Sequence, residues 1–214
     1  IVWDGGIPNL MAALAGVTSL GAEDEALTIN QKTVKAMTSQ LRMRCGYTIQ
    51  WAQAVCDSAS PAVTARTVRA LTADTPGGWF DGHALLEVKH PEGWRLYDLA
   101  LGYTYGAAPL ALKDALPLQP STPRTKLCAK SFSVGPAGSG FDVGAWGALR
   151  VRNEAALFAD MERVLQIPGI DDTNGLTWFY LPPGMESRSA WVLSLSPSFR
   201  VLSKADWLAR FYPN

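Results

Sequence analysis

The chemistry that this sequence could perform depends on one thiol, one imidazole and one carboxylate. Cys45, His83 and Asp98 follow each other in that order along the chain. A cysteine acts as a nucleophile when a neighbouring imidazole takes its proton, and a carboxylate can orient that imidazole. Each residue type alone is common, so the hypothesis of a cysteine-dependent acyl-transfer site depends on the sequence around each of the three.

The segment CGYTIQWAQAVCD (45–57) predicts a helix that begins at Cys45. Ile49, Ala52, Gln53 and Cys56 follow Cys45 at helical spacing, and no proline interrupts the segment. In the first turn of a helix, unpaired N–H groups and the helix dipole stabilise a thiolate, which is the reactive form of cysteine. The alternative is that the thiol is a small buried apolar group, as most free cysteines are.

The next segment predicts a hairpin around the turn HPEG (90–93). If Lys89 lies opposite Trp94, strand alternation places His83 and Asp98 on the same face as diagonal neighbours. The carboxylate could then bind one imidazole nitrogen and direct the other toward the thiol. Taken separately, the histidine could simply begin a strand and the aspartate could begin a turn.

Four motifs in this region resemble the transglutaminase-like core found in many bacterial proteins. They are RCG (44–46), ARTV (65–68), GHALLEV (82–88) and WRLYD (94–98), which stand in the family's order and lie within about a third of the chain. The resemblance implies papain-like chemistry, with the cysteine as nucleophile, the histidine as base and the aspartate as orienting group. After the aspartate, many members continue with Pro-Thr, whereas this chain has Leu-Ala. The departure leaves the triad intact and the substrate undefined.

The expected fold class is α+β, with a papain-like or transglutaminase-like core in which the nucleophile helix packs on an antiparallel sheet. We expect an N-terminal helical arm (1–43), the catalytic core (44–105), a loop-rich connection with many Pro, Gly and Ser residues (106–150) and a C-terminal α+β extension (151–214) packed on the core.

Periodicity predicts further elements outside the triad. The expected elements are a helix within 23–43 with an apolar stripe of Ala26, Ile29, Val34, Met37 and Leu41, a strand at 65–73, a helix at 153–166 stopped by Pro168-Gly169, strands at 176–181 and 190–196, and a helix at 204–212 capped by Ser203 with Asp206.

Three more residues are candidates for the site. Gln40 lies five residues before the nucleophile, and a nearby amide can donate to an oxyanion. The alternative for Gln40 is an amide on a helix surface. Trp79 and Phe80 precede His83 in a glycine-flanked loop and could form the wall of a substrate channel, or they could simply pack against the core.

Composition excludes several classes of function. Lys plus Arg equals Asp plus Glu in number, and no basic stripe is present, which argues against a nucleic-acid partner. No apolar run approaches 18 residues, so no membrane span is expected and the chain is predicted to be soluble. Two histidines and scattered cysteines form no zinc signature, and we expect neither a metal nor a cofactor.

The three cysteines do not form a disulfide framework. This pattern is compatible with a reducing compartment and favours a cytoplasmic location, although the localisation stays open. The chain begins with Ile1 and not with Met, which is compatible with the removal of a leader.

The expected function is hydrolysis or acyl transfer at an amide bond through a thioester, as in a peptidase, amidase or transglutaminase. The substrate would be a peptide, a protein side chain or a small amide or acyl compound. One alternative is an acyltransferase that uses coenzyme A or a carrier protein as thioester donor. Arylamine N-acetyltransferases have a similar order of residues, but their Arg-Gly-Gly lead into the cysteine is Met-Arg here. A second alternative is a binding module without turnover.

Overall fold

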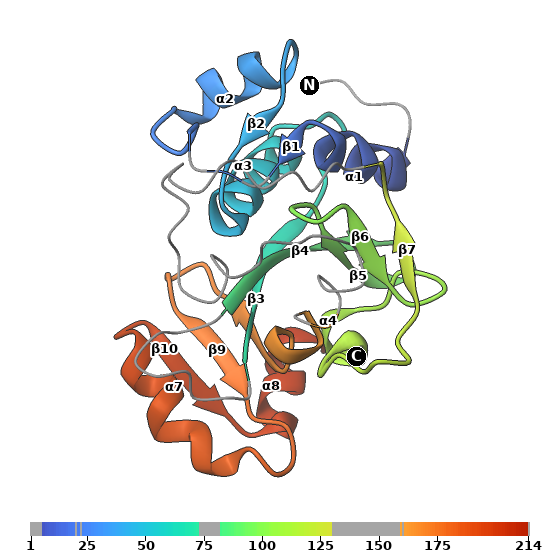
Figure 1. The fold of residues 1–214 in the computed structure, drawn as a ribbon. Coiled ribbons are helices and arrows are strands. Elements are labelled where there is room, and N and C mark those ends of the chain that lie inside the picture. The colour runs from blue at the N-terminus through green and yellow to red at the C-terminus, as the bar shows by residue number, and fades with distance from the viewer. Residues whose placement is uncertain are drawn as a thin grey trace.

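An eight-stranded sheet forms the centre of the computed structural model, which describes residues 6–19, 21, 23–72, 82–129, 159 and 161–213 (Figure 1). Within these residues the strand order is β10-β9-β8-β3-β4-β5-β6-β7. The strands are β3 (Ala65–Leu71), β4 (Gly82–His90), β5 (Gly93–Asp98), β6 (Tyr103–Tyr105), β7 (Arg124–Lys126), β8 (Ile167–Asp171), β9 (Thr177–Tyr180) and β10 (Phe199–Leu202). Among the described strands of this eight-stranded sheet, only β9 and β10 pair in parallel, so the class is α+β with a large mixed sheet.

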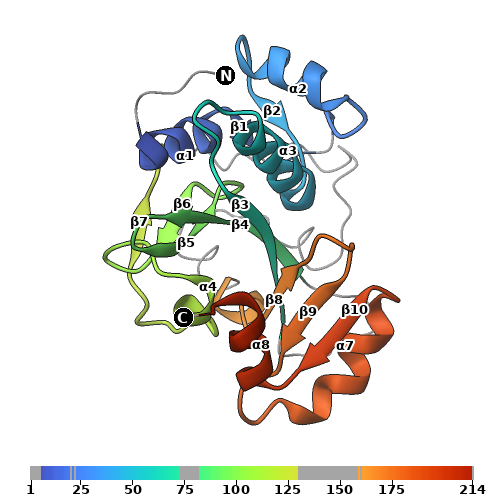
Figure 2. The ribbon, with the colours of Figure 1, turned by 180° about the vertical axis from the view of Figure 1, so that it is seen from behind.

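Helices pack on both faces of this sheet. Those in the described part of the chain are α1 (Gly6–Gly16), α2 (Ile29–Ala36), α3 (Cys45–Asp57), α4 (Leu112–Ala115), the 3-10 turn η1 (Glu186–Arg188), α7 (Ser189–Leu195) and α8 (Lys204–Phe211). A short parallel pair, β1 (Thr18–Ser19) and β2 (Leu41–Arg42), accompanies the first three helices. These N-terminal elements gather at one end of the molecule, and β8 to β10 with α7 and α8 gather at the other (Figures 1 and 2). None of the described helices is both long and apolar enough to cross a membrane.

Alternation along β4 explains how one strand contributes to two cores. Leu86 and Val88 pack with the apolar side of α3 on one face, and Leu85 packs into a second cluster on the other face. Strands that are buried on both faces read as nearly continuous apolar runs, as residues 84–86 do here. The face that carries α3 is called the α3 face below.

The local patterns around the triad are confirmed. The helix expected over residues 45–57 is α3, and its buried side includes the predicted Ile49, Ala52 and Cys56. The hairpin has the expected register, with Lys89 opposite Trp94. The strands expected at 65–73 and 176–181 are β3 and β9, and Ser203 caps α8 by accepting the N–H of Asp206.

The helix expected within residues 23–43 is wrong in extent. Only α2 is helical, and a capping box of Thr28 and Gln31 begins it. Ile29, Val34 and Met37 are exposed by 41, 66 and 76%, so they do not form a buried stripe. Residues that flank α2 are fixed by hydrogen bonds to charged side chains and not by helical hydrogen bonds. Asp24, for example, accepts the Arg42 N–H through its carboxylate.

The strand expected at 190–196 is also wrong, because this segment forms the helix α7. The reason is topological. The adjacent strands β9 and β10 are parallel, and parallel neighbours need a crossover connection, which is usually helical.

The described helical residues of the segment 153–166 end at position 164, before the predicted stop at Pro168-Gly169, and these two residues belong to the strand β8. Pro168 pairs with Ala70 of β3, but β9 pairs with β8 only from Gly169 onward, so the missing N–H of the proline is tolerated at the strand's beginning. A Cβ on Gly169 would lie 2.4 Å from the ring of Phe179, so the strand needs glycine at this position. Of the helix expected at 153–166, residues 159 and 161–164 are described and helical, residues 165 and 166 are described and not helical, and the rest lies outside the described residues.

Candidate functional site

Cys45 is the first residue of α3. The preceding Arg44 has the extended backbone of an N-cap residue, and its side chain makes no capping hydrogen bond. The N–H groups of the first helical turn are therefore available beside the thiol, where they and the helix dipole favour negative charge. Cys45 as a residue is half-buried, and burial acts on its thiol.

His83 and Asp98 meet on one face of the β4–β5 hairpin. Nε2 of His83 lies 2.8 Å from Oδ2 of Asp98, and both residues are buried. This is the diagonal contact that strand alternation predicts for the observed register. Because Nε2 is engaged by the carboxylate, Nδ1 is the imidazole nitrogen that can exchange a proton with another group.

Asp98 is held by two further donors. The backbone N–H of Leu101 donates to Oδ1 at 3.0 Å, and the hydroxyl of Tyr105 donates to Oδ2 at 3.0 Å. Burial, together with the negative charge of Asp98, raises the pKa of Tyr105 well above its usual value, so the phenol stays a donor. Tyr105 is not among the site residues that the sequence predicts. A predicted strand at 103–105 paired with β5 would have placed it diagonally across from Asp98.

The thiol of Cys45 lies beside the point on β4 where the pairing with β5 ends. The even-numbered N–H groups of β4 face β5, because odd-numbered Lys89 donates its N–H to Thr64 on the other side. In the described residues, pairing with β5 reaches no further along β4 than Leu86. The next N–H on that side belongs to Ala84, and it donates to the sulfur of Cys45.

Cys45 and His83 influence each other's charge. Burial would raise the pKa of the Cys45 thiol, but the positive charge and hydrogen bond of His83 and the N–H of Ala84 outweigh it, so this pKa is lowered. Burial would lower the pKa of His83, but the negative charges of Asp98 and Cys45 and their hydrogen bonds raise it. Both shifts favour a thiolate beside an imidazolium. By contrast, burial raises the pKa of Cys56 to about 12.

An ion pair fixes Arg44, the residue that precedes Cys45. Glu25 accepts the backbone N–H of Arg44 at 3.0 Å, its Nε at 2.7 Å and its Nη2 at 2.6 Å. The hydrogen bond with Glu25 is the main reason that the pKa of Arg44 is raised, and the charge of Cys45 adds to it. Glu25 therefore anchors the start of α3. Glu25 is not among the site residues that the sequence predicts, because its contact with Arg44 depends on a turn at 23–26, within a segment for which the sequence predicts a helix.

The structure describes only one of the other three candidates. Gln40 is exposed and lies just before β2, so its position gives no support for an oxyanion role. Trp79 and Phe80 lie outside the described residues. Within the described part of the chain, no group of three or more His, Cys, Asp or Glu side chains is placed to hold a metal ion.

Comparisons of the chain with protein-family models, with curated proteins and with solved structures found no match. The functional argument therefore depends on the residues and their geometry.

Proposed function

We propose that this protein is a cysteine-dependent enzyme of the transglutaminase-like type that hydrolyses or transfers acyl groups at amide bonds. The observation that carries the proposal is the buried His83–Asp98 hydrogen bond together with the mutual effect of Cys45 and His83, which lowers the pKa of the thiol and raises that of the imidazole. The papain-like character of the core belongs to the same proposal. It is supported by the nucleophile helix α3, which packs on the antiparallel strands β3 and β4.

The energetic argument favours a functional role over simple packing. Burial of ionisable groups is costly unless they are paired, and apolar residues of similar size often stabilise a core better. The arrangement places the imidazole of His83, a proton acceptor, beside the thiol of Cys45 at a helix N-terminus, where a low-pKa cysteine is expected.

The proposed reaction has two stages. The Cys45 thiolate attacks the carbonyl carbon, and the oxyanion that forms can accept backbone N–H groups from the first turn of α3. The C–N bond breaks as the His83 imidazolium gives its proton to the leaving amine, which leaves a thioester on the sulfur. Water or a second amine then attacks the thioester and passes a proton to His83, and the thiolate leaves with its electron pair. Asp98 orients the ring and stabilises the imidazolium throughout.

Acylation with p-nitrophenyl acetate tests this proposal directly. We expect mass spectrometry to find the acetyl group on Cys45, and we expect water to remove it, or added glycine ethyl ester to remove it faster. Faster release by the amine would indicate transfer, and release by water alone would indicate hydrolysis.

The matched controls are Cys45→Ala and Cys128→Ala, since Cys128 is the other half-buried thiol. Acetylation should disappear in the first variant and persist in the second. Equal acetylation of all three cysteines, or an unchanged rate in Cys45→Ala, would contradict the proposal and favour a binding module.

A further inference from the structure

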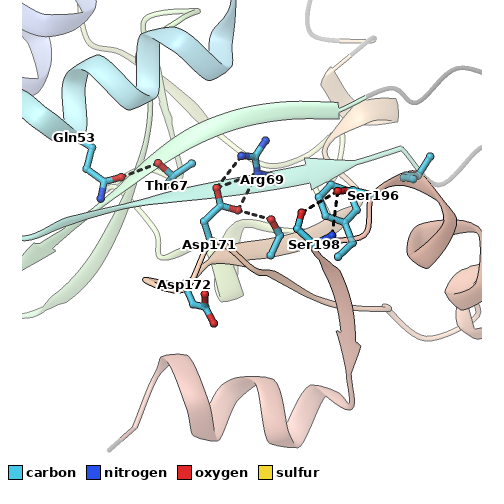
Figure 3. Close-up of a pocket in the computed structure, with 11 residues that line it drawn as sticks. Gln53, Thr67, Arg69, Asp171, Asp172, Ser196 and Ser198 are labelled. Atoms are coloured by element: carbon cyan, nitrogen blue, oxygen red, sulfur yellow. Dashed lines mark hydrogen bonds and ion pairs between the residues drawn. The ribbon is translucent and has the colours of Figure 1, made fainter. Parts of the chain in front are cut away.

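A polar cavity of about 590 Å³ lies on the α3 face of the sheet, between α3 and the C-terminal end of α7 (Figure 3). Its floor includes Thr67 and Arg69 of β3 and Asp171 of β8, and its rim includes Gln53 of α3. Covered sheet faces are normally apolar. The neighbouring part of this face, which includes Leu86 and Val88 of β4, is also apolar. Polar residues here therefore mark a part of the sheet that none of the described helices covers, and the cavity volume is in the range of small-molecule sites.

The acceptor groups of the cavity are already engaged. Asp171 accepts Nε of Arg69 at 2.9 Å, Nη2 of Arg69 at 2.9 Å and the hydroxyl of Thr177 at 2.7 Å. Oε1 of Gln53 accepts the hydroxyl of Thr67 at 2.7 Å. These bonds fix the orientation of both the guanidinium and the amide.

The groups that keep hydrogen-bonding capacity are donors. Within the described residues, no hydrogen bond engages Nη1 of Arg69 or Nε2 of Gln53. Ser196 and Ser198 bond to each other at 2.9 Å, which uses one of their two hydroxyl hydrogens. A guanidinium edge, an amide NH₂ and one hydroxyl therefore remain to donate to a ligand.

The charges around the cavity allow an anionic ligand. Arg69 balances Asp171, and their side chains are exposed by 32 and 22%. The nearby Asp172 is neutralised by Arg210 at 3.3 Å and accepts the indole N–H of Trp178. No excess of negative charge therefore opposes a carboxylate that binds to the donors.

The helix α3 and the β3–β4 ladder each contribute residues both to the cavity lining and to the surroundings of Cys45. Gln53 follows Cys45 by eight residues, which is about 12 Å along a helix. Arg69 lies opposite Ala84, whose N–H contacts the sulfur. Gly46, the residue after the nucleophile, has open space where a Cβ would be.

We propose that this cavity is a recognition subsite for a carboxylate on the substrate of Cys45, with Arg69 and Gln53 as the specificity-determining residues. The inference rests on the proposed function. A carboxylate only accepts hydrogen bonds, so it matches a set of donors, whereas a primary carboxamide would leave its own NH₂ unpaired. A buried polar group without a partner is the usual basis of such discrimination.

The test uses chloroacetyl-(Gly)n peptides, with n from one to six, that end either in a carboxylate or in a carboxamide. An extended chain spans about 3.3–3.6 Å per residue, so about three or four residues would reach the cavity from Cys45. At that length we expect the carboxylate probe to alkylate Cys45 about tenfold faster than its carboxamide partner, as expected for a hydrogen bond to a charged group. With one glycine, the two rates should be nearly equal.

Variants connect this preference to the cavity. The double variant Arg69→Gln with Asp171→Asn keeps the pair neutral and should remove the preference, and Gln53→Leu should reduce it. Gln50→Leu, which changes an exposed glutamine on the same helix outside the cavity, should leave it unchanged.

Chloroacetamide itself separates the two proposals. Slow labelling of Cys45 by this small probe would overturn the proposed function and this inference with it. Fast labelling by chloroacetamide, combined with equal rates for the carboxylate and carboxamide peptides at every length, would overturn the subsite alone. An unchanged preference in the double variant would also overturn it.

Discussion

Two buried carboxylates lie on the same face of the β4–β5 hairpin, but their partners differ in kind. Glu87 and Asp98 are both fully buried, and the leucines that share their face, Leu85 and Leu96, belong to one core cluster. Glu87 pairs with Arg66 at 2.7 Å, and Arg66 carries a permanent charge. Asp98 pairs with a histidine, which is a titratable group in contact with a thiol.

The surroundings of Glu87 indicate a structural role. Its carboxylate also accepts the N–H of Leu112 at 2.7 Å and the hydroxyl of Tyr212 at 2.8 Å. Arg66 donates to the Phe211 carbonyl and lies over the ring of Trp94, with its guanidinium carbon 3.9 Å from the ring centroid. This cluster fastens the end of α8 to the hairpin. The same hairpin thus uses one carboxylate to hold the fold and, in our proposal, another to prepare a reaction.

Replacement of the imidazole should have the largest effect on reactivity. In His83→Ala we expect Cys45 alkylation by iodoacetamide near neutral pH to fall by about 100-fold or more, the range that a positioned acid–base group contributes. Site-resolved mass spectrometry measures the rate, and a thermal melt checks that the variant is folded. A rate within twofold of the wild type would contradict the role of His83.

Breaking the Arg66–Glu87 pair should have the largest effect on stability. Arg66→Leu leaves a buried carboxylate without its cation, and such changes cost about 3–5 kcal/mol. Urea unfolding measures the loss, and the double variant Arg66→Leu with Glu87→Leu should recover most of it. In the folded protein the alkylation rate of Cys45 should not change. An Arg66→Leu variant as stable as the wild type would contradict the structural role of this pair. Slow alkylation of Cys45 in the folded variant would contradict the separation of this pair from the reactive site.

Matched carboxylate-to-amide changes sharpen the contrast. Asp98→Asn should slow Cys45 turnover or alkylation by no more than His83→Ala does, because Asp98 acts through the ring. Glu87→Gln should leave the Cys45 rate unchanged and lower the free energy of unfolding. If Asp98→Asn keeps the full rate while its thermal melt is normal, Asp98 has no part in the mechanism, and only a Cys45–His83 dyad remains.

The smallest expected effect belongs to Tyr105. Tyr105→Phe removes one hydrogen bond to Asp98 and should cost about 1 kcal/mol of stability. It should slow alkylation less than Asp98→Asn does. Tyr97→Phe is a suitable control, because the Tyr97 hydroxyl bonds to His90 at the far end of the hairpin. A larger rate effect in Tyr97→Phe than in Tyr105→Phe would contradict the assignment.

The sequence predicted the parts of the site that depend on local pattern. The helix after Cys45 and the Lys89–Trp94 register follow from helical spacing and from a turn between alternating strands. The contact between His83 and Asp98 follows from that register, because the strands' alternation decides which side chains share a face. These features involve residues close together in the chain.

The sequence did not predict features that depend on distant pairing. The Arg69–Asp171 contact joins residues 102 positions apart and requires β8 to lie beside β3. The helix α7 was mistaken for a strand because its sequence suits both, and the parallel pairing of β9 with β10 decides between them. Tyr105 and Glu25 contact the site only through elements whose positions are set by tertiary packing.

The central claim is that His83 and Asp98 keep Cys45 as a thiolate, and the pH dependence of site-resolved alkylation tests it most directly. A free cysteine has a pKa of about 8.5. We expect Cys45 alkylation to follow an apparent pKa below that value and to stay fast as the pH falls to neutral, because the imidazolium offsets the cost of burial. Cys56, whose pKa is raised to about 12, should react slowly over the same range. In His83→Gln the apparent pKa of Cys45 should rise to the ordinary value or above it, since burial is then no longer offset. A wild-type Cys45 that titrates at or above 8.5, with no change in His83→Gln, would contradict the account.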